Sequence, residues 1–215
     1  LIHTSAIYLQ EHEGTKKYSG MYQVMNLEKE QVLRAKLNGN HFFSPSVIVR
    51  KECFDKVGNW DEEFIRAQDY DMWARIARYY EVGVIPIPTL HYRIHDGVRG
   101  SKDDHIQVSE VYERTKKYDQ LIRKKMHQLP IDILFPTSMN RNGTAALVES
   151  YLERALYMIN NDLIEECIED LESAKLLVGD TIYLNFSARG LTIVDQLYKA
   201  IDQVGNSNAL VIILY

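Results

Sequence analysis

Cysteine and proline are scarce in this chain, which has two cysteines and five prolines in 215 residues. Cys53 and Cys167 lie far apart in apolar, helix-like surroundings, so a reducing compartment is the simplest interpretation. No apolar run approaches the roughly 20 residues that span a bilayer, and no sequence typical of a signal peptide opens the chain. These absences favour a cytoplasmic globular protein, with the inner face of a membrane as one alternative.

Several sequence motifs of common enzyme classes are also absent. The chain contains no Gly-x-Ser-x-Gly elbow, no Walker-type phosphate loop and no Gly-x-Gly-x-x-Gly dinucleotide motif. Charge is unevenly distributed: residues 130–215 hold 5 Lys and Arg against 12 Asp and Glu, whereas the upstream residues hold 20 against 18. This front part is too weakly basic to indicate nucleic-acid binding, and the change in composition predicts a boundary near Pro130.

The periodicity of apolar residues predicts a mixed α/β part followed by an all-α part. The first part is predicted to have strands at 2–9, 42–49, 82–87 and 89–94, and helices at 27–37, 50–57, 70–80 and from about 101 to 126. The second part is predicted to have amphipathic helices at 144–159, 163–178 and 186–204. The predicted domains are therefore residues 1–129 and a helical segment, residues 130–208.

The helical segment resembles one tetratricopeptide helix pair, because small and large apolar residues alternate along 151–157 and 167–174. A single repeat cannot bury its own faces, so we expect a helical appendage that docks on the first part, binds a protein partner or self-associates. Residues 209–215 form an apolar, β-branched run. We interpret this run as a terminal strand or as the start of a further domain.

The stretch from Gly58 to Arg75 contains the strongest candidate for a catalytic base. Asp69 and Asp71 form an Asp-x-Asp string, but side chains two apart on a helix point roughly 200° away from each other, which argues against shared metal binding. Asp71 is expected to face solvent or to pair with Arg75. Asp69 lies at the predicted helix start, where the helix dipole favours a carboxylate, so it suits both a cap and a proton acceptor.

Other polar and aromatic residues have both a structural and a functional interpretation. Trp60 and Trp73 suit a core, or stacking on the apolar face of a sugar. Asp61 suits a turn, or binding of hydroxyl groups. On the predicted strand, His91, Arg93 and His95 share one face. This face is either simply exposed, or it binds a diphosphate together with Arg99, Ser101 and Lys102, or one of its histidines binds a metal.

Four successive segments together resemble the acceptor-side half of family 2 glycosyltransferases, which are inverting enzymes with the A-type fold. The segments are Phe43 to Phe54, Gly58 to Phe64, Gln68 to Ala77, with its Gln-Asp pair, and Tyr92-Arg93-Ile94-His95. Their order and spacing match the family over roughly residues 40–101, and residues 1–14 are similar to the strand and turn that precede them there. The resemblance implies that residues 1–129 are the acceptor-side part of such a domain.

The resemblance also implies roles for individual residues. Asp69 would be the general base that activates an acceptor hydroxyl. The acceptor would contact Trp60, Asp61, Gln68 and Trp73. The donor diphosphate would contact Arg93, His95, Arg99 and Ser101, and His95 is also the candidate metal ligand.

The nucleotide-binding half of the family, with its metal-binding Asp-x-Asp, has no counterpart in these residues. We therefore expect the parent protein to use a nucleotide-sugar donor, a glycan or lipid-linked acceptor and a divalent cation, Mg²⁺ or Mn²⁺. The chain alone is expected to be inactive and to bind no cation tightly. The alternative hypothesis is a non-catalytic carbohydrate- or protein-binding module with a helical interaction surface.

Overall fold

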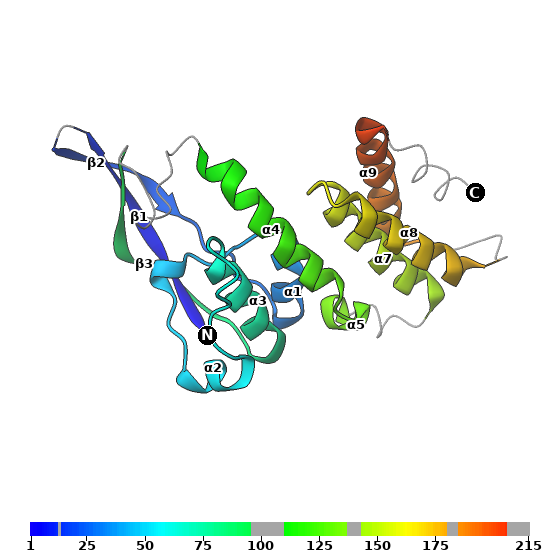
Figure 1. Ribbon diagram of the computed structural model, residues 1–215, viewed down its shortest axis with the longest axis horizontal. Coiled ribbons are helices and arrows are strands. Elements are labelled where there is room, and N and C mark those ends of the chain that lie inside the picture. The colour runs from blue at the N-terminus through cyan, green and yellow to red at the C-terminus, as the bar shows by residue number, and fades with distance from the viewer. Residues whose placement is uncertain (13, 96–109, 137–142, 180–184, 206–215) are drawn as a thin grey trace. The chain divides into compact units, whose positions relative to one another are not determined.

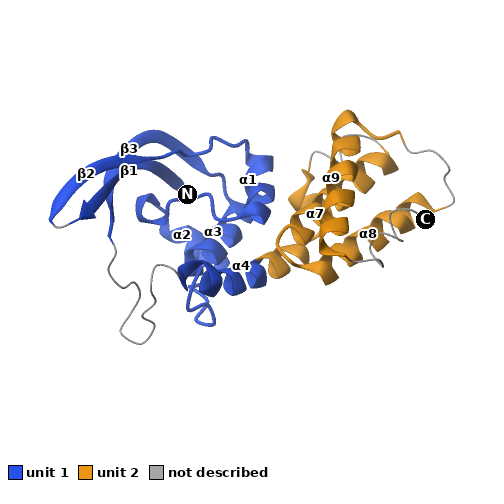
Figure 2. Cartoon of the chain, turned by 90° about the horizontal axis from the view of Figure 1, so that it is seen from above, with its two compact units in different colours: residues 1–122 blue, residues 123–215 orange. Residues whose placement is uncertain are grey.

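The computed structural model describes residues 1–12, 14–95, 110–136, 143–179 and 185–205. The chain divides into two compact units, residues 1–122 and residues 123–215 (Figure 2). The first unit combines a small sheet with helices, and the second is helical where it is described (Figure 1). This arrangement confirms the predicted order of a mixed α/β part followed by a helical part.

The sheet of the first unit has the strand order β2-β1-β3. β1 (Ile2–His12) pairs antiparallel with β2 (Thr15–Tyr22) and parallel with β3 (Gly83–Ile94). The predicted strands at 82–87 and 89–94 are thus one strand. Its pairing with β1 shifts register where Pro86 and Pro88 interrupt it, because proline has no N–H to donate, and an edge strand tolerates that loss.

Three helices of the first unit are α1 (Lys29–Ala35), α2 (Lys51–Val57) and α3 (Gln68–Tyr79). Figure 2 shows α2 and α3 on one side of the strands. α1 continues into the 3₁₀ helix η1 (Lys36–Asn38) and ends at Gly39, as predicted from Asn38-Gly39-Asn40. The core of this unit is built from the apolar faces of these helices and one loop residue: Val32, Phe42, Cys53, Met72, Trp73 and Ile76.

The predicted strand at 42–49 is wrong. This segment forms a 3₁₀ turn, η2 (Ser44–Ser46), with Pro45 in its first positions, and only Ile48 makes a bridge to Ile2. Proline fixes φ near −65° and therefore suits the start of a helical turn. The turn positions Ser44 against Asp69 and Trp73 of α3.

A long helix, α4 (Val111–His127), spans the division between the units, and α5 (Ile131–Leu134) follows it. The predicted end of the charged helix near Met126 is confirmed, whereas its predicted start near Ser101 lies outside the described residues. The second unit contains α7 (Thr144–Ile159), α8 (Ile164–Val178) and α9 (Ala188–Val204), and α7 packs against both α8 and α9. All three predicted helices are confirmed; residues 209–215 lie outside the described part.

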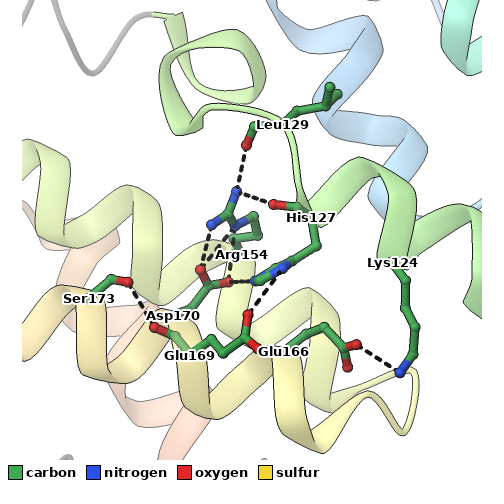
Figure 3. Close-up of polar contacts among 8 residues, drawn as sticks. All are labelled: Lys124, His127, Leu129, Arg154, Glu166, Glu169, Asp170 and Ser173. Atoms are coloured by element: carbon green, nitrogen blue, oxygen red, sulfur yellow. Dashed lines mark hydrogen bonds and ion pairs between the residues drawn. The ribbon is translucent and has the colours of Figure 1, made fainter.

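The second unit has a buried ion pair between Arg154 of α7 and Asp170 of α8 (Figure 3). Arg154 Nε lies 3.0 Å from both carboxylate oxygens, and Nη2 lies 2.6 Å from Oδ1. Arg154 Nη1 donates to the carbonyl oxygens of His127, at 2.9 Å, and Leu129, at 3.1 Å. A buried guanidinium requires this many acceptors, because an unsatisfied charge in the interior is strongly destabilising.

Both cysteines are buried and unpaired, one in α2 and one in α8, as the interpretation of a reduced protein requires. Burial raises the pKa of the Cys167 thiol to about 12, so this thiol is protonated at neutral pH. Among the described helices, none is both long enough and apolar enough to cross a bilayer.

Candidate active site around Asp69

The start of helix α3 presents the candidate base. Ala67 precedes the helix in the left-handed conformation, with φ 56°, and Gln68 is the first helical residue. Asp69 follows in the first turn, where the backbone N–H groups and the helix dipole stabilise a negative charge. Its side chain is half-buried. The structure therefore places a half-buried carboxylate at the positive end of the helix dipole.

Two hydrogen bonds hold the Asp69 carboxylate from outside the helix. Asn40 Nδ2 donates to Asp69 Oδ2 at 3.0 Å, and Ser44 Oγ donates to the same oxygen. Asn40 follows Gly39, whose φ of 146° turns the chain sharply after η1, and Ser44 begins the η2 turn. Asn40, just after η1, and Ser44, at the start of η2, thus together fix the orientation of the Asp69 carboxylate.

Both tryptophans of the chain belong to the same cluster. Trp73 lies four residues after Asp69, on the same face of α3, and its Nε1 donates to Ser44 Oγ at 2.9 Å. The Trp73 ring is only 5% exposed and packs edge-on against Trp60, with ring centroids 5.5 Å apart. Trp60 is 45% exposed. The structure thus brings together three predicted residues, Asp69, Trp60 and Trp73, and leaves Trp60 the accessible ring.

Lys36, which was not predicted from the sequence, completes the network through Asn40. Its side chain is fully buried; Nζ donates to Asn40 Oδ1 at 3.0 Å and lies 3.4 Å from the centroid of the Phe42 ring. Burial lowers the pKa of Lys36 to about 7, and the charge of Asp69 acts in the opposite direction. One signal was available: Lys36 lies four and three residues after the buried Val32 and Leu33, on the apolar face of the helix.

Two histidines lie close to Lys36. The His3 ring stacks on Phe42 with centroids 4.5 Å apart, and its Nδ1 is buried without a hydrogen-bond partner. Burial, and secondarily Lys36, lowers the pKa of His3 to about 4. The pKa of His41 is also lowered, mainly by burial, and its Nε2 lies 2.6 Å from the carbonyl oxygen of Ala35. Both rings are therefore neutral at pH 7.

Asp71 has different partners from Asp69. It is only 3% exposed, and Arg75 Nε donates to its Oδ2 at 2.8 Å. Arg75 also donates to the carbonyl oxygens of Val57 and Asn59, which ties α3 to the loop before Trp60. The predicted pairing with Arg75 is confirmed, and the alternative of a solvent-facing Asp71 is wrong because Asp71 is buried.

The remaining predicted acceptor residues lie at the edge of this cluster. Gln68 is exposed at the start of α3. Asp61 Oδ1 accepts a hydrogen bond from the Glu63 backbone N–H at 3.0 Å, the geometry of a side chain that stabilises its own turn. The structure thus supports the structural role of Asp61 directly, and binding of acceptor hydroxyls by Asp61 and Gln68 stays a prediction.

The predicted diphosphate-binding residues are only partly described. Arg93 and His95 lie at the end of β3, and Arg93 Nη1 forms an exposed ion pair with Glu11 at 3.2 Å. Arg99 and Ser101 lie outside the described residues. No three His, Cys, Asp or Glu side chains come together as a metal site within the described ranges. The role of His95 in metal binding stays a prediction.

A cluster of aromatic residues on the sheet was also missed. Tyr8 of β1 and Tyr92 of β3 are register partners, and their rings lie 6.0 Å apart. Phe43 packs against Tyr92 at 5.2 Å and against Tyr22 at 5.1 Å. All four rings are half-buried. Phe43 directly precedes Ser44, so this aromatic cluster adjoins the hydrogen-bond network of Asp69; parallel pairing of distant strands left no local signal for it.

Comparison of the chain with known protein families, with curated proteins and with solved structures finds no match.

Proposed function

We propose that this chain is the acceptor-side part of an inverting glycosyltransferase with the A-type fold, which transfers a sugar from a nucleotide-sugar to a glycan or lipid-linked acceptor. One observation carries the proposal. The Asp69 carboxylate is half-buried in the first turn of α3, and its Oδ2 accepts hydrogen bonds from Asn40 and Ser44. This is the arrangement that a general base requires: an ionised group held in one orientation.

The proposed chemistry is a single displacement. The acceptor hydroxyl attacks the anomeric carbon of the donor while its proton passes to Asp69. The bond from the anomeric carbon to the diphosphate oxygen breaks on the opposite face, and the nucleoside diphosphate leaves with the electron pair. Configuration at the anomeric carbon is inverted because attack and departure occur on opposite faces.

The aromatic residues support a sugar as the acceptor. Trp60 presents an indole that is 45% exposed, and it is connected to Asp69 through Trp73 and Ser44. An aromatic face binds the C–H face of a pyranose, while the polar edge of the sugar stays free for hydrogen bonding. A hydroxyl of a sugar stacked in this region would be directed to the base by neighbouring polar groups.

The donor side of the proposal depends on residues that the structure describes only in part. Arg93 and His95 at the end of β3 would contact the diphosphate. The described residues gather no set of ligands for the divalent cation that such enzymes use, so this part of the chain does not fit such a cation on its own. The proposal assigns no step to a metal within it.

The test uses the full-length gene product that contains these residues. Release of nucleoside diphosphate from UDP-, GDP- and dTDP-sugars is measured with a panel of glycan and lipid-linked acceptors. Asp69→Asn is expected to lower transfer about a hundredfold or more, because the amide cannot accept the proton. The matched control is Asp55→Asn, at an exposed position in α2, which should leave transfer unchanged.

Two outcomes would count against the proposal. Transfer that survives Asp69→Asn with its rate intact would remove Asp69 as the base. Absence of transfer with every donor and acceptor in the full-length protein would remove the enzymatic function itself.

A further inference from the structure

Lys36 is tied to the first turn of α3 at two points. Its side chain reaches Asp69 through Asn40: Lys36 Nζ donates to Asn40 Oδ1 at 3.0 Å, and Asn40 Nδ2 donates to Asp69 Oδ2 at 3.0 Å. Its backbone carbonyl accepts a hydrogen bond from the hydroxyl of Tyr70, the neighbour of Asp69 in α3. Lys36, which lies outside α3, is thus connected to the first turn of α3 through both its main chain and its side chain.

The orientation of the Asn40 amide is decided by the groups on its oxygen side. Oδ1 accepts from Lys36 Nζ and, at 3.2 Å, from the backbone N–H of Phe42. Two donors on Oδ1 require that the amide nitrogen point the other way, toward Asp69. If the Lys36 donor is removed, Asn40 Oδ1 keeps only the hydrogen bond from the backbone N–H of Phe42.

We propose that Lys36 is a positioning residue for Asp69: it fixes the Asn40 carboxamide, which in turn holds the carboxylate in the orientation that accepts a proton. This inference rests on the proposed role of Asp69 as the general base. It adds a residue that touches neither substrate nor the reacting atoms, and that acts only through Asn40.

The burial of Lys36 agrees with this role. A lysine that is fully buried beside Phe42 and Tyr70 is destabilising unless its polar end has a partner, so its position requires a reason other than packing. The lowered pKa, about 7, does not disable the contact, because both the ammonium and the neutral amine can donate to Asn40.

The kinetic test is a double-mutant cycle in the full-length gene product. Lys36→Met keeps the length of the side chain and removes the donor, and Asn40→Leu removes the amide. Each single variant is expected to lower kcat by roughly tenfold to a hundredfold, with KM for the acceptor within about twofold of wild type, because positioning rather than binding is lost. Lys29→Met, at an exposed position in α1, is the matched control and should leave kcat unchanged.

The double variant separates action through Asn40 from an independent effect. If Lys36 acts through Asn40, the double variant is no slower than Asn40→Leu alone. Effects that multiply would overturn the proposal, as would an unchanged kcat in Lys36→Met.

A second measurement on the wild-type chain needs no enzymatic activity. The side-chain amide of Asn40 is followed by ¹⁵N NMR and assigned by its loss in Asn40→Leu. The other charged or titratable groups that act on Lys36 or lie beside it are Asp69, Tyr70, His3 and His41, and the pKa values of both histidines are lowered. We expect the Asn40 amide to shift with a midpoint near pH 7 as Lys36 loses its proton.

An Asn40 amide that stays constant over the whole range in which a lysine loses its proton, from about pH 6 to about pH 12, would overturn the proposal whether or not the protein transfers sugar. By contrast, a titrating amide together with full transfer by Asp69→Asn would refute the proposed function and leave the link from Lys36 to Asn40 intact. The two failures are therefore distinguishable.

Discussion

At the scale of single residues, Trp73 shows how one side chain serves both the core and the candidate site. Its ring is 5% exposed among core residues of the first unit, and its Nε1 donates at 2.9 Å to the hydroxyl that holds Asp69. This donor and the Asp69 carboxylate, to which the Ser44 hydroxyl donates, together fix the position of the Ser44 oxygen. A side chain that has little surface to offer a substrate thus contributes by orienting Ser44.

Replacing Trp73 by Phe keeps an aromatic ring in the core and removes the indole donor. We expect transfer to fall by about threefold to tenfold and the free energy of unfolding to fall by about 1 to 3 kcal/mol, because a hydrogen bond and part of a buried ring are lost. Transfer is measured by nucleotide release and stability by urea unfolding.

Trp60→Phe is the control: it also replaces an indole by a phenyl ring, but the indole that donates to Ser44 belongs to Trp73. It is expected to raise KM for the acceptor and to leave kcat nearly unchanged, because Trp60 is the exposed ring. An equal loss of kcat in both variants would contradict the distinction between the two tryptophans.

At the scale of the element, helix α9 begins with a cap that a second helix supports. Ser187 Oγ accepts from the Gly190 backbone N–H at 3.0 Å, and the same hydroxyl donates to Glu149 Oε2 of α7 at 2.8 Å. Gly190 has no side chain at the point of closest approach: a Cβ there would lie 2.5 Å from Glu149 Oε1. The start of α9 thus depends on the Ser187 cap and on a glycine at position 190, which leaves room for the Glu149 side chain.

Gly190→Ala is expected to destabilise the second unit by about 1 to 3 kcal/mol, even though alanine is the better helix former, because the added methyl displaces the Glu149 carboxylate. The measurement is thermal unfolding followed by far-ultraviolet circular dichroism.

Thr192→Ala, at an exposed position in the same helix, should leave stability within about 0.5 kcal/mol and serves as the control. A stabilised Gly190→Ala protein would show that Glu149 moves aside at no cost.

The elements also show which features the sequence could predict. Helices with strong apolar periodicity, such as α3 and α7, were predicted with ends accurate to about two residues. β2 was missed because its residues are mostly exposed and polar, so that its structure depends on pairing with β1. The segment around Ser44 was predicted as a strand because its composition is β-rich, but Pro45 and the hydrogen bonds of Ser46 to Thr4 and Phe43 select a turn.

The candidate site was predictable only in its local part. Asp69 and Trp73 share one helical face, and that relation is fixed by spacing. The contributions of Asn40, Ser44 and Lys36 depend on how a loop between two helices folds back onto α3, and no local pattern encodes such a contact. The sequence therefore indicated the candidate base, Asp69, and missed the residues that hydrogen-bond to it or lie behind it.

At the scale of the molecule, buried ionisable groups of the first unit couple its stability to pH. The pKa of His3 is about 4 in the folded protein and 6.5 in the unfolded chain. Between these values the unfolded state binds more protons, so the free energy of unfolding falls as the pH falls through this window. The pKa of Lys36 is about 7 in the folded protein and 10.5 in the unfolded chain. Between these values the unfolded state again binds more protons, so the free energy of unfolding rises as the pH rises from 7 to 10.5.

His3→Phe is expected to remove the part of the pH dependence of stability that lies between about pH 4 and pH 6.5. On acidification from pH 6.5 to 4, the wild-type protein should lose up to about 3 kcal/mol more unfolding free energy than the variant, since each pKa unit corresponds to about 1.4 kcal/mol. Both tryptophans lie in the first unit, so tryptophan fluorescence during urea unfolding reports on that unit. Parallel curves for the two proteins would show that His3 is not buried as a neutral ring.

The ion pair between Arg154 and Asp170 has a consequence for the order of events during synthesis. The carbonyl oxygens of His127, the last residue of α4, and of Leu129, two residues later, leave the ribosome 27 and 25 residues before the guanidinium that binds them, and Asp170 follows 16 residues after Arg154. Until then, those oxygens lack the Arg154 donor. The final turn of α4 is therefore completed late, when the α7–α8 hairpin has emerged, and a pause in translation before Asp170 would leave the end of this helix frayed.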